Sequence, residues 1–105
     1  MSKLGIMVNK QVKIAEGVIS HQTTLGETLL LNTRTLVYFG LDEVGTTVWS
    51  CIQSGTSIRE WAALVSERHA LPEADSERKC GAILEGLKRC GLIEISSPGP
   101  LSPGA

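Results

Sequence analysis

With 105 residues and a formal net charge of −1, the chain is long enough for one modest domain and carries no bulk charge. A near-neutral chain has no general electrostatic attraction to nucleic acid or to an anionic membrane. No apolar run approaches the ~18 residues of a membrane-spanning helix, and the N-terminus lacks the pattern of a secretory signal. We therefore expect a single domain with neither nucleic acid nor membrane as a partner.

The cysteine content indicates the compartment. Cys51, Cys80 and Cys90 are odd in number and show no CxxC spacing. This pattern favours reduced thiols over a disulfide framework, so the sequence predicts a cytoplasmic protein.

The first half of the chain reads as β structure. Residues 1–15 are weakly patterned and predict an N-terminal arm, either extended or disordered. Three runs rich in β-branched or alternating apolar residues then predict a three-stranded antiparallel meander. These strands are expected at residues 17–22, 28–31 and 35–40.

The apolar period changes to three or four residues after Leu41, which predicts helices. Asp42 is placed to cap the first helix and Gly55 to end it. The pattern Ser57-x-x-Glu60 is a capping box for the second helix. The remaining elements are a third helix that starts at 75 or 76 and stops at Gly91, and a short final strand at 92–95.

The order of elements defines the fold class. Three strands followed by three helices predict an α+β domain of winged helix-turn-helix character, covering residues 16–95. Residues 96–105 are too rich in Pro, Gly and Ser to pack, and predict a disordered tail.

No residue pattern indicates catalysis, a metal or a cofactor. His21 and His69 have no further ligand at a metal-binding offset, and both are expected at the surface or at a strand edge. The cysteines fit small buried thiols, and Trp49 and Trp61 fit core packing. No nucleophile elbow or phosphate-binding glycine loop is present, so the sequence predicts a protein that is not an enzyme and uses no cofactor.

The third strand is the most informative element. Val37 and Phe39 alternate with Leu36 and Tyr38, so both faces of this strand are apolar, and it carries no charge. An uncharged, apolar edge strand is normally avoided because it invites pairing. Either the protein's own helices or strands cover it, or a peptide adds to it as a further strand.

The third helix could instead suggest a DNA-reading helix, because it contains Arg78, Lys79, Lys88 and Arg89. Acidic residues interleave with these cations, and charge that nearly cancels gives little affinity for phosphates. A solvated amphipathic helix is the simpler interpretation.

Three segments together resemble the PqqD-like family of peptide-recognition domains. They are G-x-x-x-L-L-N-x-x-T-x-x-Y-F-x-L-D-x-x-G-x-x-V-W at 26–49, Q-S-G-T-S-I-R-E at 53–60 and L-x-x-C-G-L-I at 87–93. The stretch from Tyr38 to Trp49 is most similar to stand-alone members of lasso-peptide gene clusters. One departure is that Thr33, Arg34 and Thr35 stand where the family often has a glycine before the third strand.

The resemblance implies a function and a site. Such domains bind the leader of a ribosomally made precursor peptide as an antiparallel strand beside the third strand, and deliver it to an enzyme. In lasso systems this enzyme is a cysteine-protease-like leader peptidase. In this chain, the third strand would supply the backbone hydrogen bonds to the leader. The third helix, around Ile83, would form the opposite side of the binding groove. Cations at the edge of this groove would meet acidic leader residues. The implied peptide-binding residues are Arg34, Thr35, Leu36, Val37, Tyr38, Phe39, Arg78, Lys79, Ala82 and Ile83. Alternation alone leaves open which face of the strand meets the helices.

Two other hypotheses stay open at this point. One is a winged-helix regulator, whose DNA affinity would fall steeply with salt. The other is pairing of two third strands in a homodimer, so the protein is expected as a monomer or a weak homodimer.

Overall fold

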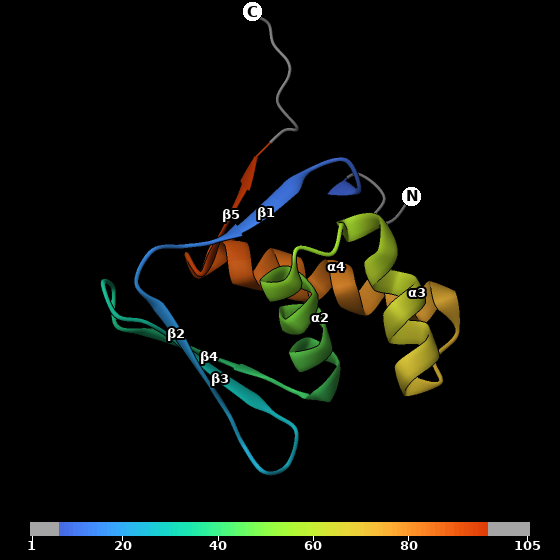
Figure 1. Cartoon of the computed structure of the whole chain (residues 1–105), viewed down its shortest axis with the longest axis horizontal. Helices are drawn as coiled ribbons and strands as arrows, with labels where there is room; N and C mark the ends of the chain where they lie inside the picture. The colour runs from blue at the N-terminus through green and yellow to red at the C-terminus, as the bar shows by residue number, and fades with distance from the viewer. Residues whose placement is uncertain (1–6, 97–105) are drawn as a thin grey trace, which may run out of the picture.

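The structure is a computed structural model, and it describes residues 7–96 (Figure 1). A three-stranded antiparallel sheet is formed by β2 (Val18–Gln22), β3 (Thr28–Asn32) and β4 (Val37–Leu41), in the order β2-β3-β4. Three helices follow, which are α2 (Glu43–Ser54), α3 (Ile58–His69) and α4 (Glu73–Arg89). The predicted α+β class and the order of strands then helices are confirmed.

A second sheet was not predicted. β1 (Gln11–Ile14) pairs antiparallel with β5 (Ile93–Ser96), with Gln11 opposite Ser96 and Ile14 opposite Ile93. The final strand was expected, but the arm at residues 1–15 was expected without a strand. Ser96, which was predicted in the tail at 96–105, is the last residue of β5. Residues 1–6 of the predicted arm and residues 97–105 of the predicted tail lie outside the described residues.

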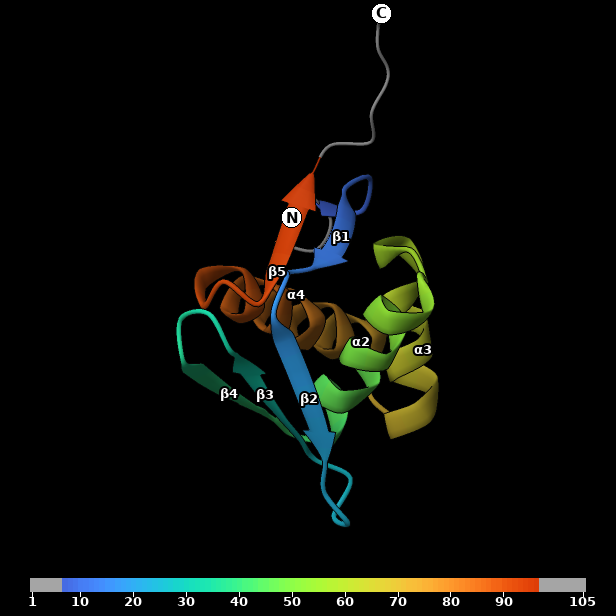
Figure 2. The same ribbon diagram turned by 60° about the vertical axis from the view of Figure 1, so that its left-hand side comes forward.

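The long helix α4 lies between the two sheets. In both views the β1–β5 ribbon is on one side of α4 and the three-stranded sheet is on the other (Figures 1 and 2). Two connections fix this arrangement at the C-terminal end of α4. Ala15 N–H donates to Leu92 O, and the side-chain amide of Asn32 donates to Gly91 O at 2.9 Å.

The helix ends follow local chemistry. Asp42 caps α2 as predicted, because its Oδ1 accepts from Gly45 N–H at 2.8 Å, and Gly55 ends the helix in the left-handed region at φ 79°. Ser57 occupies the N-cap position of α3, but its side chain makes no capping hydrogen bond, so the predicted capping box is wrong.

The third helix starts earlier than predicted. α4 begins at Glu73, directly after Pro72, instead of at 75 or 76. Two acidic residues in its first turn, Glu73 and Asp75, favour this start because they face the positive end of the helix dipole. Gly91 adopts φ 73° after the helix, as expected for a residue that stops it.

The core lies between α2, α3 and α4 and extends to the inner face of the three-stranded sheet. Trp61 is fully buried and its indole N–H donates to Thr56 O at 3.0 Å, and Trp49 is also buried, as predicted. The largest fully buried side chains that share this core with them are Leu30, Val48, Ile58, Val65, Leu84, Leu87 and Leu92.

We expect Asp42→Ala to lower the free energy of unfolding by about 1 kcal/mol, because the Gly45 N–H then loses its acceptor. Asp42→Asn is the matched control and should retain most of the stability, since its amide oxygen can accept the same bond. Urea denaturation followed by circular dichroism measures both, and equal losses in the two variants would contradict the capping role.

Candidate functional site: the free edge of β4

β4 is an edge strand of the three-stranded sheet. Its side chains alternate, so that Val37, Phe39 and Leu41 turn toward the interior while Tyr38 is 65% exposed on the outer face. The alternation that the sequence left open is therefore decided. Val37 and Phe39 lie on the face that meets the helices, and Tyr38 lies on the opposite face.

The direction of the backbone groups on β3 follows from two hydrogen bonds to β2 and the turn beyond it. Thr33 N–H donates to Gly17 O at 2.9 Å, and Thr23 N–H donates to Glu27 O at 2.8 Å. Successive residues of a strand direct their backbone groups to opposite sides. Odd-numbered positions of β3 therefore bond toward β2, and even-numbered positions bond toward β4.

The same alternation fixes the free edge. Phe39 pairs with Leu30, an even-numbered position, so its N–H and C=O point into the sheet. The N–H and C=O of Tyr38 and Gly40 consequently point away from β3. Two residues thus present four backbone hydrogen-bonding groups along the unpaired edge of β4.

Three of the predicted peptide-binding residues lie in the turn before β4. Arg34, Thr35 and Leu36 belong to the β3–β4 turn, and the strand starts at Val37 instead of at 35. Leu36 has φ 62°, and its N–H donates back to Asn32 O at 2.7 Å. The N–H of Leu36 is therefore already used within the turn and is not free for the predicted backbone ladder.

The side chain of Asn32 organises this turn. Its Oδ1 accepts from the N–H groups of Arg34 and Thr35, at 2.9 Å and 3.2 Å, while its amide reaches Gly91 beyond α4. A turn built on an asparagine needs no glycine before the strand, which accounts for the departure from the family pattern.

α4 lies directly beside the inner face of β4. A Cβ atom placed on Gly86 would be 2.9 Å from Cζ of Phe39, so the absence of a side chain at 86 lets the ring rest against the helix. Ile83 is half-buried and packs against the core. Ala82 and Lys79 are exposed and lie on the same helical face as Gly86, because residues three and four apart in a helix are neighbours.

The structure therefore brings part of the predicted set together. Phe39 lies against the face of α4 that carries Gly86, and Val37 is on the same face of β4 as Phe39, while Tyr38 is on the opposite face. Arg78 and Lys79 lie further along α4, where a hollow of about 330 Å³ is lined by Leu71, Asp75, Arg78, Lys79 and Ala82. Gly40 and Gly86 were missed, although a glycine in the interior of an amphipathic helix is a sequence signal for close packing.

The outer face of the sheet is unusually apolar. Ile19, Leu29 and Tyr38 are exposed by 57%, 44% and 65%, and Leu31 stands between Ile19 and Tyr38 across the strands. No charged residue is on this face within the described strands. The helices therefore cover only one of the two apolar faces of β4.

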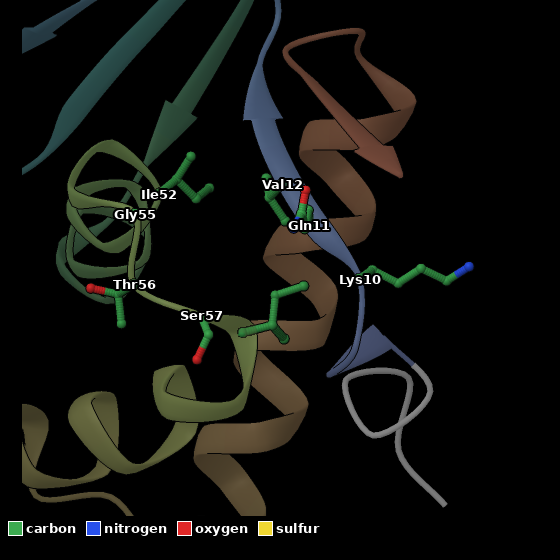
Figure 3. Close-up of a pocket in the computed structure, with 8 residues that line it drawn as sticks. Lys10, Gln11, Val12, Ile52, Gly55, Thr56 and Ser57 are labelled. Atoms are coloured by element: carbon green, nitrogen blue, oxygen red, sulfur yellow. The ribbon is translucent and has the colours of Figure 1, made fainter. Parts of the chain in front are cut away.

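A second cavity lies away from this edge. It has a volume of about 310 Å³ and lies between β1 and the α2–α3 connection (Figure 3). Its lining combines the chain around Lys10 and Val12 with that around Thr56 and Ser57, and holds one ionisable side chain, that of Lys10. This composition supplies neither a nucleophile with a base nor a set of metal ligands.

The histidine and cysteine side chains of the described chain fit structural roles. No group of three or more metal-ligating side chains occurs among residues 7–96. His69 is half-buried and Nε2 lies 2.8 Å from Thr47 Oγ1, while His21 is exposed on β2. Burial raises the pKa of the Cys51 thiol and raises that of Cys80 to about 11, so both thiols stay protonated at neutral pH and are poor nucleophiles. Within the described part of the chain, no helix is both long and apolar enough to span a bilayer.

Comparison with known proteins agrees with this geometry. Residues 27–93 match the family model described as coenzyme PQQ synthesis protein D (PqqD). This match covers more than half of the chain, and the chain therefore belongs to the PqqD family. A search of curated proteins finds no match.

Two solved structures are similar over most of the chain. The first is TbiB1 in complex with the TbiA(beta) leader peptide, at 30% identity and a TM-score of 0.71, covering 78% of this chain and 94% of that one. The second is lasso peptide synthetase B1 complexed with the leader peptide, at 21% identity and a TM-score of 0.71, covering 80% and 98%. The second likeness concerns the fold alone.

The direction of the backbone groups on β4 predicts a pattern of amide exchange. The N–H groups of Phe39 and Leu41 are bonded to β3 and should exchange at least about tenfold more slowly than those of Tyr38 and Gly40. Hydrogen–deuterium exchange followed by NMR measures each amide. Strong protection of Tyr38 in the isolated protein would show that the edge is already paired.

The raised pKa of Cys80 predicts a loss of stability at alkaline pH. The thiol titrates at its ordinary value of 9.0 in the unfolded chain and at about 11 in the folded one. Its contribution is fully present below pH 9 and is lost as pH rises toward 11, by up to ~2.7 kcal/mol. Cys80→Ala should be less stable at neutral pH but should lose less between these pH values. Equal pH dependence of the two proteins in denaturant titrations would contradict this.

Proposed function

We propose that this protein binds the leader segment of a ribosomally made precursor peptide by β-strand addition, and delivers it to a modifying enzyme. The observation that carries the proposal is the free edge of β4, where the backbone groups of Tyr38 and Gly40 point away from the sheet. Membership of the PqqD family and the similarity to TbiB1, which is seen with a leader peptide, support it.

The edge of β4 suits an extended peptide because it offers free backbone hydrogen-bonding groups and carries no charged side chain. An extended guest can form backbone hydrogen bonds to Tyr38 and Gly40, as in other complexes that form by strand addition. We propose that it runs antiparallel to β4, so that its N-terminal part lies beyond Leu41.

Side-chain contacts would come from both faces of the added strand. Alternate residues of the guest would point inward, between Phe39 and the α4 face that carries Ala82, and Ile83 would form the base of this groove. The other residues would join the outer face beside Tyr38. Each apolar anchor buried in this way contributes about 1.5–3 kcal/mol, part of which offsets the ordering of a flexible peptide.

The proposed role is delivery, since no catalytic arrangement is found in the described residues. The enzyme that receives the peptide would be a cysteine-protease-like leader peptidase of a lasso-peptide system.

We place this step in the cytoplasm, where the precursor is synthesised, and we propose that the working form is a monomer or a weak homodimer. A free β4 edge can pair with a second copy, and a guest peptide would then compete with self-association.

No observation favours DNA binding. α4 carries four acidic residues (Glu73, Asp75, Glu77 and Glu85) against four basic ones (Arg78, Lys79, Lys88 and Arg89), so the helix has no net charge with which to attract a phosphate backbone.

The test uses two probes: the TbiA(beta) leader peptide, and peptides selected from a random 14-residue display library on the immobilised protein. Tyr38→Pro removes the outward N–H of the edge and should weaken binding at least about tenfold, because one ladder bond is lost and the ring obstructs the guest backbone. Tyr38→Ala is the matched control, since it removes the side chain and keeps the N–H, and it should bind more tightly than Tyr38→Pro. Titration calorimetry measures the affinities.

Circular dichroism checks that the proline variant is folded, which is expected because the lost N–H makes no bond within the sheet. Unchanged affinity in folded Tyr38→Pro would remove β4 from the binding site. Failure of the wild-type protein to bind the leader and to select any peptide would overturn the proposed function itself.

A further inference from the structure

The N-terminal half of α4 carries a feature that backbone pairing at β4 does not use. The hollow lined by Leu71, Asp75, Arg78, Lys79 and Ala82 combines an apolar floor with three charged side chains. Arg78 is neutralised locally, because its guanidinium lies 2.8 Å from the carboxylate of Asp75. For Lys79 no ion pair or hydrogen bond is found among residues 7–96, so the hollow carries one unpaired positive charge.

This hollow lies on the face of α4 that adjoins β4. Positions 75, 79, 82 and 86 fall on one face of α4, at the three- and four-residue steps of a helix. Gly86 on this face contacts Phe39, and the end of the helix near Gly91 is bonded to Asn32, which pairs with Val37. Moving from Val37 toward Leu41 along β4 therefore corresponds to moving from the C-terminal end of α4 toward Lys79.

The distance from Gly86 to Lys79 along α4 can be compared with distances along an added strand. Lys79 is seven residues from Gly86, about 10 Å along a helix that rises 1.5 Å per residue. A strand covers that distance in about three residues, and a lysine side chain can reach a further residue. The inward-facing positions of a guest strand are two residues apart, so those that Lys79 can reach lie two or four residues from the position opposite Phe39.

We infer that Lys79 and the hollow beside it form a charge-selective subsite for an acidic side chain of the guest peptide, two or four residues N-terminal to the residue opposite Phe39. This inference rests on the proposed function and deepens it, because it assigns the guest a charge at a stated place. An Asp or Glu there would pair with the ammonium group of Lys79, while the methylene groups of the guest residue lie over Leu71 and Ala82.

The subsite also favours one orientation of the bound peptide. The backbone ladder of an edge strand accepts a peptide of almost any sequence, and the inward apolar contacts repeat every two residues. A single unpaired cation at one end distinguishes one register and one orientation from the others. Charged groups at the edge of an interface act mainly in this way, on specificity and on the rate of association.

The test compares peptides selected by three proteins from the random 14-residue display library. The wild-type protein should select peptides that share an acidic residue two or four positions N-terminal to the apolar residue assigned opposite Phe39. Lys79→Glu should select Lys or Arg at that position instead. Lys88→Glu, a change of the same charge on the opposite side of α4, should select the same peptides as the wild type.

Affinities then measure the pair directly. Replacing the acidic residue of a selected peptide by its amide should weaken binding to the wild type about two- to fivefold at 50 mM salt, the range for an exposed ion pair. The difference should shrink at 500 mM salt and vanish in Lys79→Gln. Lys79 is exposed, so both variants are expected to fold.

The outcomes separate this inference from the proposed function. Peptides that depend on the Tyr38 N–H but show no charge preference, or one unchanged in Lys79→Glu, would overturn the subsite and leave strand addition intact. An acidic residue found on the C-terminal side would overturn the stated direction of the guest. Selection of no peptide by the wild type would instead count against the proposed function.

Discussion

The contact between Phe39 and Gly86 fixes the relation of the sheet to α4, and the other features of the site depend on it. The ring can rest against the helix because residue 86 has no side chain, and a Cβ atom at that position would lie only 2.9 Å from Cζ of the ring. The contact makes the Phe39 face of β4 the inner face and puts Tyr38 outside. It also holds α4 beside the edge of β4, so that an added strand would contact the helix as well as the free backbone groups of β4.

A free, uncharged edge strand is a risk that folded proteins usually reduce with charges, proline or cover. β4 has none of these, and the outer face of its sheet adds exposed Ile19, Leu29 and Tyr38. Stability does not account for this arrangement, because covering such surface would be favourable. A site kept open for an extended partner does account for it, and the elements around it are well fixed by Asn32, Asp42 and the helix ends.

The errors made from the sequence have identifiable physical causes. Residues 11–14 have a weak pattern of their own, and they become a strand because β5, about eighty residues later in the chain, offers a partner. Leu36 has the apolar character of a strand residue, but it adopts φ 62° in a turn that Asn32 holds. In the first case pairing with a distant strand outweighs the local propensity, and in the second case hydrogen bonds within the turn do so.

The sequence by itself determined the order of strands and helices, the cap at Asp42, the stop at Gly91, the buried tryptophans and the presence of an uncharged apolar strand. These features depend on periodicity and on side chains that act within a few residues. Only the tertiary structure decided which face of β4 meets α4 and which backbone groups of β4 remain free. It also decided that the face of α4 that carries Gly86 and Lys79 is the one that adjoins β4. Those properties depend on the register between strands and on the packing of a helix some forty residues further along the chain, and no local pattern encodes either of them.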